Sequence, residues 1–250
     1  METVKIKNSR NLNLVGDLYT ADSDKIIIMS HGFAYDRHKQ WDNFGQIIET
    51  LNKVGYNILT FDFSGSGESD DDSISVGKEV DDLKSVIKFA REKGYNNIIL
   101  LAMSLGGLIS LSAYDEDIKA MILISPVTQK VDSGYRHHKF SKEQLSEFKE
   151  NGQLVYYIDN AIRKKIIIDR QYILDREELN SKLLLRNIKC PVLIFHGDED
   201  GIVSFKDSQK SVKMLGNKGE LYIVKGEGHS FRDSTEVIVN KTINWLAKKV

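Results

Sequence analysis

The chain has 250 residues, 41% of them hydrophobic, which is enough for a sizeable core in one large domain or two small ones. Its 35 Lys and Arg and 36 Asp and Glu are spread along the sequence and leave a net charge of -1, so neither nucleic acid nor an anionic membrane is expected as a partner. The start, METVKIKNSR, lacks the apolar core of a signal peptide, and no apolar run approaches the roughly 18 to 20 residues of a membrane span. We expect a cytoplasmic protein without a membrane span.

Short apolar runs alternate with segments of helical periodicity, which predicts an α/β fold with a mostly parallel sheet flanked by helices. The six runs are KIIIM (25–29), YNILTFDF (56–63), NIILLA (97–102), KAMILIS (119–125), PVLIFH (191–196) and ELYIV (220–224). Their continuous hydrophobicity is typical of strands buried on both faces. Before them, VKIK and NLNLVGDLY alternate apolar and polar residues and predict a half-exposed antiparallel hairpin, so the sheet should be mixed.

Helices are predicted from apolar stripes between these runs. One stripe contains Trp41, Phe44, Ile47, Ile48 and Leu51, a second contains Val80, Leu83, Ile87 and Ala90, and a last helix is expected over 235–248.

The alternation of apolar runs and helical segments is interrupted between Pro126 and Pro191 by a charged stretch that contains tyrosines. Its middle predicts either a small hairpin or two helical turns, and its flanks, EQLSEFKE and REELNSKLLL, predict helices. Because the chain has only two prolines and no Gly/Ser linker, we expect a single domain over 1–250 with a cap inserted at about 127–186.

Ser104 ends the apolar run in NIILLAMSLGGLIS (97–110), with the small residues Ala102 and Gly106 two positions away on either side. A serine on a sharp strand-to-helix turn projects its hydroxyl above the sheet, and the chain there is too close-packed for large neighbours. The usual pattern is G-x-S-x-G, and Ala102 departs from it. On this stretch alone, a serine that merely caps the following helix explains the pattern equally well.

Serine needs an imidazole to take its proton and a carboxylate to orient that imidazole. The turn HGDEDGIV (196–203) carries three acids after one predicted strand, and KGEGHSF (225–231) places His229 in a glycine-rich loop after the next. The order Ser104, Asp200, His229 follows successive strands at one sheet edge, where such sites are built. Early in the chain, Gly32 in SHGF permits a turn that aims the N–H of Phe33 at the site, and with the N–H of Leu105 it would form an oxyanion hole.

Taken together, these segments and FDFSGSGES (61–69) resemble the α/β-hydrolase family over nearly the whole chain. The similarity is greatest to the serine esterase branch of bacterial cinnamoyl and feruloyl esterases and monoglyceride-lipase-like enzymes, whose cap is inserted after the sixth strand. The resemblance implies that Asp200, not Asp198 or Glu199, is the triad acid. The family's D-x-R-G-x-G-x-S appears with Ser64 and Ser66 in place of Arg and His, which leaves the substrate open.

Several other residues carry simpler interpretations. His31 and His196 are expected to order loops, His137 and His138 to lie on the cap surface, and Cys190, the single cysteine, to pack as a small hydrophobe. No spacing indicates a metal site or a cofactor, and GSGES lacks the nucleotide-binding pattern. The tyrosines of the insertion could line an aromatic pocket or form the core of the cap: Tyr156, Tyr157 and Tyr172.

The resulting hypothesis is a serine carboxylesterase that acts through an acyl-enzyme on small-molecule esters of small to medium acyl or aroyl groups. Two alternatives stay open: a thioesterase, acyltransferase or peptidase of the same fold, and a non-catalytic binding module. The sequence does not indicate the oligomeric state.

Overall fold

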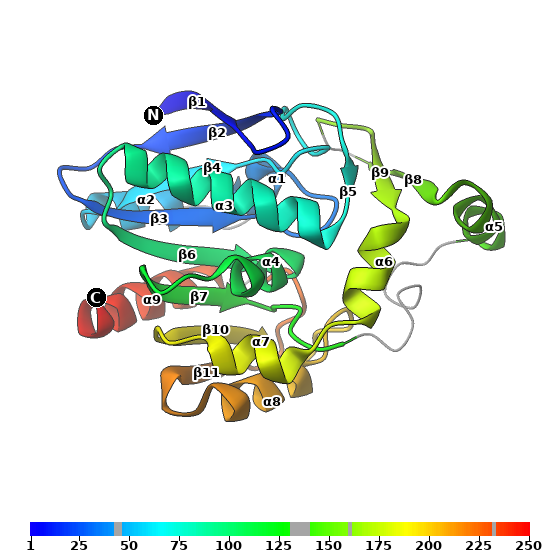
Figure 1. Cartoon of the computed structure of the whole chain (residues 1–250). Coiled ribbons are helices and arrows are strands. Elements are labelled where there is room, and N and C mark those ends of the chain that lie inside the picture. The colour runs from blue at the N-terminus through cyan, green and yellow to red at the C-terminus, as the bar shows by residue number, and fades with distance from the viewer. Residues whose placement is uncertain (43–46, 131–140, 160–161, 232–233) are drawn as a thin grey trace.

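A mixed sheet forms the centre of the molecule, in a computed structural model that describes residues 1–42, 47–130, 141–159, 162–231 and 234–250 (Figure 1). The 8-stranded sheet has the order β1-β2-β4-β3-β6-β7-β10-β11. Its strands are β1 (Glu2–Lys7), β2 (Asn13–Tyr19), β3 (Lys25–Ser30), β4 (Asn57–Phe61), β6 (Asn97–Met103), β7 (Ile118–Ile124), β10 (Val192–Gly197) and β11 (Gly219–Val224). All six predicted apolar runs are strands, and they pair in parallel.

The N-terminal hairpin is antiparallel as predicted, but its two strands differ in exposure. Strand β1 lies at the edge and alternates exposed and buried residues. Strand β2 pairs on its other side with β4, so its residues 14–18 are all buried and the expected half exposure is wrong there. Gly16 shows how tightly the strand is enclosed, since an added Cβ would lie 2.7 Å from the carbonyl oxygen of Thr60.

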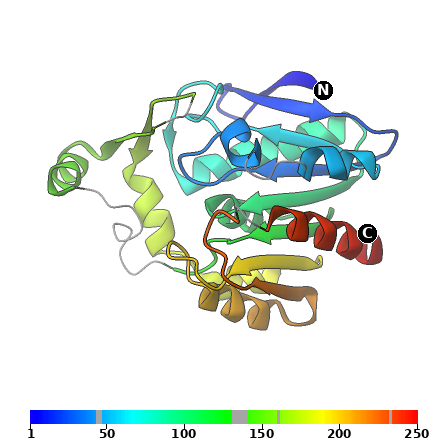
Figure 2. The ribbon, with the colours of Figure 1, turned by 180° about the vertical axis from the view of Figure 1, so that it is seen from behind.

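Helices cover both faces of the sheet (Figures 1 and 2). One face carries α3 (Val76–Glu92), α4 (Leu105–Ala113), α7 (Ser181–Asn187) and α8 (Phe205–Leu215), and the other carries α1 (Arg37–Asp42), α2 (Ile47–Lys53) and α9 (Thr235–Lys249). The predicted stripe at Val80 to Ala90 lies on α3, and the predicted last helix is α9. The stripe from Trp41 to Leu51 falls on α1 and α2, and its Phe44 lies outside the described residues.

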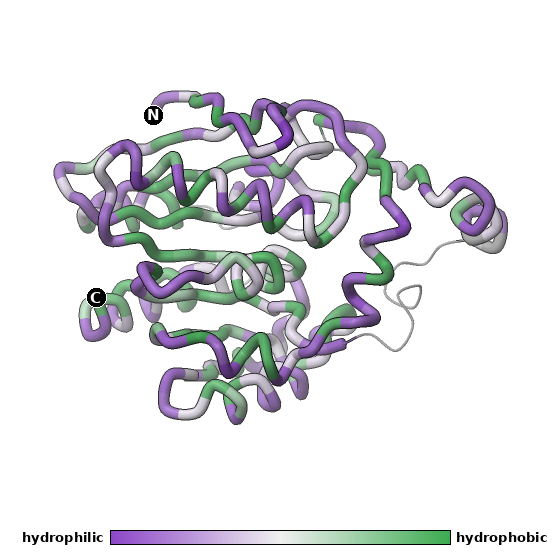
Figure 3. Tube along the Cα trace, viewed as in Figure 1, coloured by the Kyte–Doolittle hydropathy of each residue, from purple (hydrophilic) through white to green (hydrophobic). Residues whose placement is uncertain are grey.

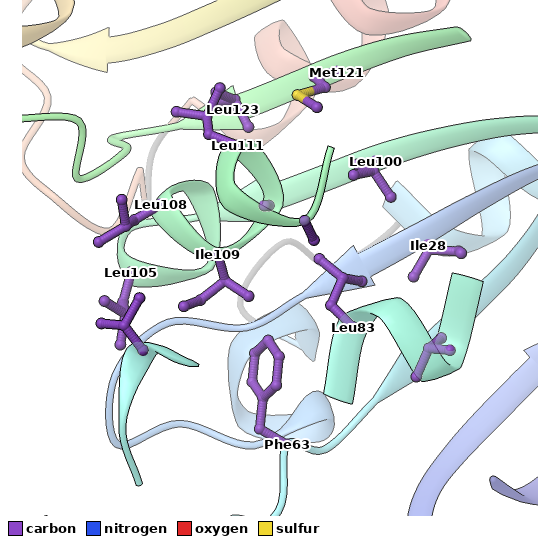
Figure 4. Close-up of a cluster of buried hydrophobic side chains, with 14 of the residues drawn as sticks. Ile28, Phe63, Leu83, Leu100, Leu105, Leu108, Ile109, Leu111, Met121 and Leu123 are labelled. Carbon is purple, nitrogen blue, oxygen red and sulfur yellow. The ribbon is translucent and has the colours of Figure 1, made fainter. Parts of the chain in front are cut away.

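The core has two parts, one on each face of the sheet. On the α3 and α4 face, Leu108 and Ile109 pack with strand residues such as Leu100 and Leu123 (Figure 4). The other part contains Trp41 and Trp245. The hydropathy of the residues follows this arrangement: the central strands are hydrophobic, while the outer helices alternate hydrophilic and hydrophobic residues (Figure 3).

The inserted segment follows β7, the sixth strand of the large sheet, and lies beyond the carboxyl ends of the parallel strands (Figure 1). It contains α5 (Lys142–Asn151), β8 (Gln153–Tyr157), β9 (Lys165–Asp169) and α6 (Arg170–Glu177), followed by α7. Strands β8 and β9 form an antiparallel hairpin, which decides between the two predictions for this stretch. The hairpin also pairs in parallel with β5 (Ser73–Ile74), a contact that the sequence did not indicate.

Within the described ranges, no helix combines the length and apolar character needed to cross a membrane. The expectation that His137 and His138 lie on the cap surface falls outside the described residues.

Candidate active site

Ser104 occupies a strained strand-to-helix turn between β6 and α4. Its backbone has φ 54° and ψ -118°, a conformation that costs a non-glycine residue free energy. Two backbone hydrogen bonds hold the turn in place. The N–H of Ser104 donates to the carbonyl of Ile124 at 2.9 Å, and the carbonyl of Ser104 accepts the N–H of Val127 at 2.9 Å. Ser104 occupies the N-cap position of α4, but its side chain makes no capping hydrogen bond, so capping does not explain the hydroxyl.

The small residues around Ser104 are under unequal steric limits. A Cβ on Gly106 would lie 2.7 Å from the carbonyl oxygen of Ser30 and 2.6 Å from that of His31. Ala102 is fully buried and lies opposite Ser30 in the register of β3 and β6, where its methyl group is accommodated. The departure from the usual glycine is therefore compatible with an intact turn.

His229 and Asp200 lie together at the ends of β11 and β10. The Nδ1 of His229 is 2.8 Å from Oδ2 of Asp200, and the Asp200 side chain is fully buried. Oδ1 of Asp200 accepts the backbone N–H groups of Ile202 at 2.8 Å and Val203 at 2.9 Å. Burial alone would raise the pKa of Asp200, but hydrogen bonds from His196 and His229 outweigh it and hold the pKa well below its usual range.

The other two acidic residues of the turn contact the loop that carries His229, Asp198 through its carboxylate and Glu199 through its backbone N–H. Oδ1 of Asp198 accepts the N–H of Gly226 at 2.7 Å, and the N–H of Glu199 donates to the carbonyl of Glu227 at 3.0 Å. Both bonds fasten the loop that carries His229. His196 orders the turn at 196–203 as expected: its Nε2 lies 3.0 Å from the carbonyl oxygen of Val203, and its Nδ1 lies 2.7 Å from the Ser208 hydroxyl.

The turn at 31–33 approaches Ser104 from the end of β3. The side chain of Gln40 accepts the N–H of Gly32 at 3.1 Å, and a Cβ on Gly32 would lie 3.2 Å from the Cβ of Ser104. His31 is buried and orders this turn as expected: its Nε2 accepts the N–H of Phe63 at 3.2 Å, so Nδ1 carries the hydrogen and donates to the carbonyl of Gly32 at 2.8 Å. Burial lowers the pKa of His31, which keeps the imidazole neutral.

A cavity of about 220 Å³ joins these elements. Its lining includes Ser104 and His229 together with Phe33 and Leu105, the two residues expected to form an oxyanion hole. The N–H of Leu105 is the first of α4 and so has no acceptor within its own helix.

The tyrosines of the insertion separate into two groups. Tyr156 and Tyr172 line the cavity, with ring centroids 5.5 and 5.6 Å from that of Phe33. Tyr157 is 72% exposed and does not line it.

Sequence reasoning missed several residues near the site, because their partners are distant in the chain. Arg37 is 3% exposed and pairs with Asp17 at 2.7 Å and with Asp62 and Glu68. Asp62 also accepts the N–H of Glu68 at 2.9 Å, so the FDFSGSGES segment folds back on this carboxylate. Arg176, on α6, lines the cavity as well.

In the described part of the chain, no three His, Cys, Asp or Glu side chains form a group that could hold a metal ion. Cys190 is buried as expected, and burial raises the pKa of its thiol to about 12.

A mostly parallel sheet covered by helices, with a serine on a strained turn at its carboxyl edge, defines an α/β hydrolase. Comparison with known proteins agrees. The family described as "Serine aminopeptidase, S33" matches residues 21–186, and the chain belongs to this hydrolase family. The predicted class, a hydrolase of the esterase and lipase type, is confirmed.

Individual relatives are distant. The chain is 26% identical over 234 residues to "Putative esterase/lipase 2" of Mycoplasma genitalium, covering 84% of each protein. It is 23% identical over 229 residues to an "Acyl transferase" of Shewanella hanedai, covering 88% of this chain and 72% of that protein. Its fold matches that of ferulic-acid-bound Est1E from Butyrivibrio proteoclasticus with a TM-score of 0.80 at 21% identity, over 98% of each chain.

Proposed function

We propose that the protein is a serine carboxylesterase with Ser104, His229 and Asp200 as its catalytic triad. The observation that carries the proposal is the 2.8 Å contact between His229 and buried Asp200, with His229 and the strained Ser104 lining one cavity. A serine on a strained turn, an imidazole and a buried carboxylate are the parts that hydroxyl activation needs.

In the proposed mechanism, Asp200 accepts a hydrogen bond from Nδ1–H of His229 and so leaves Nε2 unprotonated, ready to take the proton of the Ser104 hydroxyl. Oγ of Ser104 attacks the ester carbonyl, and the N–H groups of Phe33 and Leu105 stabilise the oxyanion. His229 then protonates the leaving alcohol. Water attacks the acyl-enzyme by the same route and releases the acid.

The cavity favours small to medium acyl or aroyl groups. Its volume of about 220 Å³ is below the roughly 300 to 1,000 Å³ typical of ligand sites, and aromatic side chains of the inserted segment form one wall. We propose residues 127–186 as a cap within a single domain of residues 1–250.

The test compares initial rates on p-nitrophenyl butyrate at pH 7 to 8 for the wild type and Ser104→Ala. We expect a loss of about four to six orders of magnitude, as triad deletions cause elsewhere. Labelling of Ser104 by a fluorophosphonate is the matched control for an activated nucleophile. Rates within tenfold of each other, without labelling, would contradict the triad and favour a binding module.

Acyl transfer is the second candidate, favoured by the "Acyl transferase" relative. An acyl-enzyme passes its acyl group to an alcohol or thiol as readily as to water if the cavity orients that acceptor. The product ratio of acid to new ester in the presence of added alcohols measures this partition, and transfer dominant over hydrolysis at millimolar acceptor would reassign the enzyme.

A further inference from the structure

Gln40 contacts both halves of the proposed active site. It lies on α1, is 3% exposed and lines the cavity that contains Ser104. Its Oε1 accepts the N–H of Gly32 at 3.1 Å, and its Nε2 lies 2.8 Å from Sδ of Met103, the residue before Ser104. Because the N–H of Gly32 can only donate, the amide oxygen must face Gly32 and the amide nitrogen must face the sulfur. One side chain thus joins the turn at 31–33 to the end of β6.

This contact acts on the conformation of Gly32. A glycine has no Cβ to restrict its φ and ψ, so the peptide planes on its two sides rotate freely unless other groups hold them. Gln40 holds the first plane through the N–H of Gly32. The second plane is held at the carbonyl of Gly32, which accepts hydrogen bonds from Nδ1 of His31 at 2.8 Å and from the N–H of Tyr35 at 3.3 Å. Both planes beside Gly32 are therefore fixed.

The second of these planes carries the N–H of Phe33, a proposed oxyanion donor. The peptide bond is trans, so this N–H points away from the groups that bind the carbonyl of Gly32. Its direction is set by the two dihedral angles of Gly32. Ser104 lies close to this turn, since a Cβ on Gly32 would be 3.2 Å from the Cβ of Ser104. A rotation at Gly32 would thus move the donor relative to the nucleophile.

The helix that carries Gln40 is itself anchored away from the turn at 31–33. Arg37, also on α1, pairs with buried Asp17 of β2 at 2.7 Å and with buried Asp62 after β4. These ion pairs join α1 to the large sheet. Because α1 is held independently, Gln40 can restrain the turn without moving with it.

We infer that Gln40 is a positioning residue, which holds Gly32 so that the N–H of Phe33 meets the oxyanion in the transition state. The inference rests on the proposed esterase function and adds a residue to it. An oxyanion forms only during the reaction, so a correctly placed donor stabilises the transition state more than the bound substrate. Loss of Gln40 should therefore affect the reaction far more than the affinity for a neutral ligand.

The test replaces Gln40 by Met, which has a similar length but no amide, and by Asn, which keeps the amide but is one methylene shorter. We expect both variants to lower kcat/KM for p-nitrophenyl butyrate about 10- to 100-fold, because a misplaced donor should cost less than a missing one. Unchanged kcat/KM in both variants would overturn the inference.

Two inhibitors separate positioning of the donor from the shape of the cavity. Phenylboronic acid forms a tetrahedral adduct with Oγ of Ser104, whose proton passes to His229, and a boron-bound oxygen takes the place of the oxyanion. Its inhibition constant should rise in the Gln40 variants by the same factor as kcat/KM falls. Benzyl alcohol has a similar shape and forms no adduct, so its inhibition constant should change less than about threefold. Equal weakening of both inhibitors would overturn the inference, because Gln40 would then only shape the cavity.

Matched variants locate the effect. Gln209→Met makes the same exchange at an exposed position on α8 and should leave both inhibition constants at their wild-type values. Met103→Leu keeps the bond from Gly32 to Gln40 and should weaken phenylboronic acid less than Gln40→Met does. A larger effect of Met103→Leu would contradict the assigned role of the Gly32 bond.

Hydrogen exchange tests the bond without any variant or turnover. The N–H of Gly32 should exchange slowly in the wild type and at least about tenfold faster in Gln40→Met. Exchange in the wild type at the rate of an exposed amide would overturn the inference even if the variants do not fold. Hydrolysis and fluorophosphonate labelling that persist at wild-type rates in the Gln40 variants would overturn only the inference, whereas absence of both in the wild type would overturn the esterase proposal.

Discussion

Ser104 and Gly106 illustrate two kinds of local constraint at the same turn. Ser104 is held at positive φ by backbone hydrogen bonds to Ile124 at the end of β7 and to Val127 just beyond it, whereas Gly106 is required because backbone oxygens fill the space beside its Cα. The sequence identified both positions, since the motif is local. It did not show whether Ala102 fits, because that depends on the packing against β3.

Gly106→Ala should disrupt the turn even though alanine is the better helix former. The added methyl group would lie 2.6 Å from a backbone oxygen, so the turn must shift and misplace Ser104. We expect activity on p-nitrophenyl butyrate to fall at least about 100-fold.

The matched control is Gly77→Ala, in the first turn of α3, where the nearest neighbour of an added Cβ is 4.0 Å away. It should stabilise the protein by about 0.4 to 1 kcal/mol without loss of activity. Equal activity of both variants would refute the steric argument.

Asp200→Asn should lower kcat about 10⁴-fold, because an amide does not hold the imidazole in the tautomer that accepts the serine proton. Asp198→Asn keeps an oxygen acceptor for the N–H of Gly226 and should cost less than about tenfold. Parallel turnover measurements on the two variants check the assignment, and a larger loss for Asp198→Asn would move the triad acid to that residue.

Arg37 connects three elements through buried charges. Its guanidinium, on α1, binds Asp17 of β2 and Asp62 at the end of β4, and both carboxylates are at most 3% exposed. Its pKa is raised, because hydrogen bonds and the charges of its acidic partners outweigh burial. Removing one partner from such a cluster leaves charges buried without compensation.

Arg37→Met should therefore destabilise the fold by about 3 to 5 kcal/mol in urea unfolding. Arg91→Met breaks an ion pair to Asp115 whose two side chains are 37% and 42% exposed, and it should cost no more than about 1 kcal/mol. Similar losses for the two variants would show that burial does not set the cost.

At this scale the sequence predicted the strands well, because continuous hydrophobic runs are a local signal of burial on both faces. It missed β5, since a strand of two residues has no periodicity, and it missed Arg37 and Arg176, since nothing along the chain places them near their partners. The prediction that β2 is half exposed was wrong, because β4, the second strand that pairs with β2, is about 40 residues away in the chain.

Stability of the whole molecule should depend on pH through Glu79. Its carboxyl is 4% exposed and its pKa is raised from 4.5 to about 8 by burial and by Asp82. The folded state thus holds a proton that the unfolded state loses above pH 4.5. The stabilisation from this proton is fully present below pH 4.5 and is lost as the pH rises through 8.

Glu79→Gln removes the titrating group and should flatten the free energy of unfolding over this range. The difference between wild type and variant should change by at most about 4 kcal/mol between pH 5 and 8, in favour of the variant at the higher pH. Urea unfolding at several pH values measures it, with Glu92→Gln, exposed on the same helix, as the control. Parallel curves for wild type and Glu79→Gln would rule out a raised pKa.

The pairing of β5 with β9 has a mechanical consequence. The inserted segment is joined to the rest of the chain at its two covalent ends and, through this pairing, at a third point, with Ser73 opposite Ile167 and Ile74 opposite Ile168. A segment attached only at its two chain ends could rotate about the line through them, whereas a third attachment away from that line prevents this rotation. We therefore expect the cavity that contains Ser104 to keep a constant size, so that substrates are selected by their fit to it and not by displacement of the inserted segment.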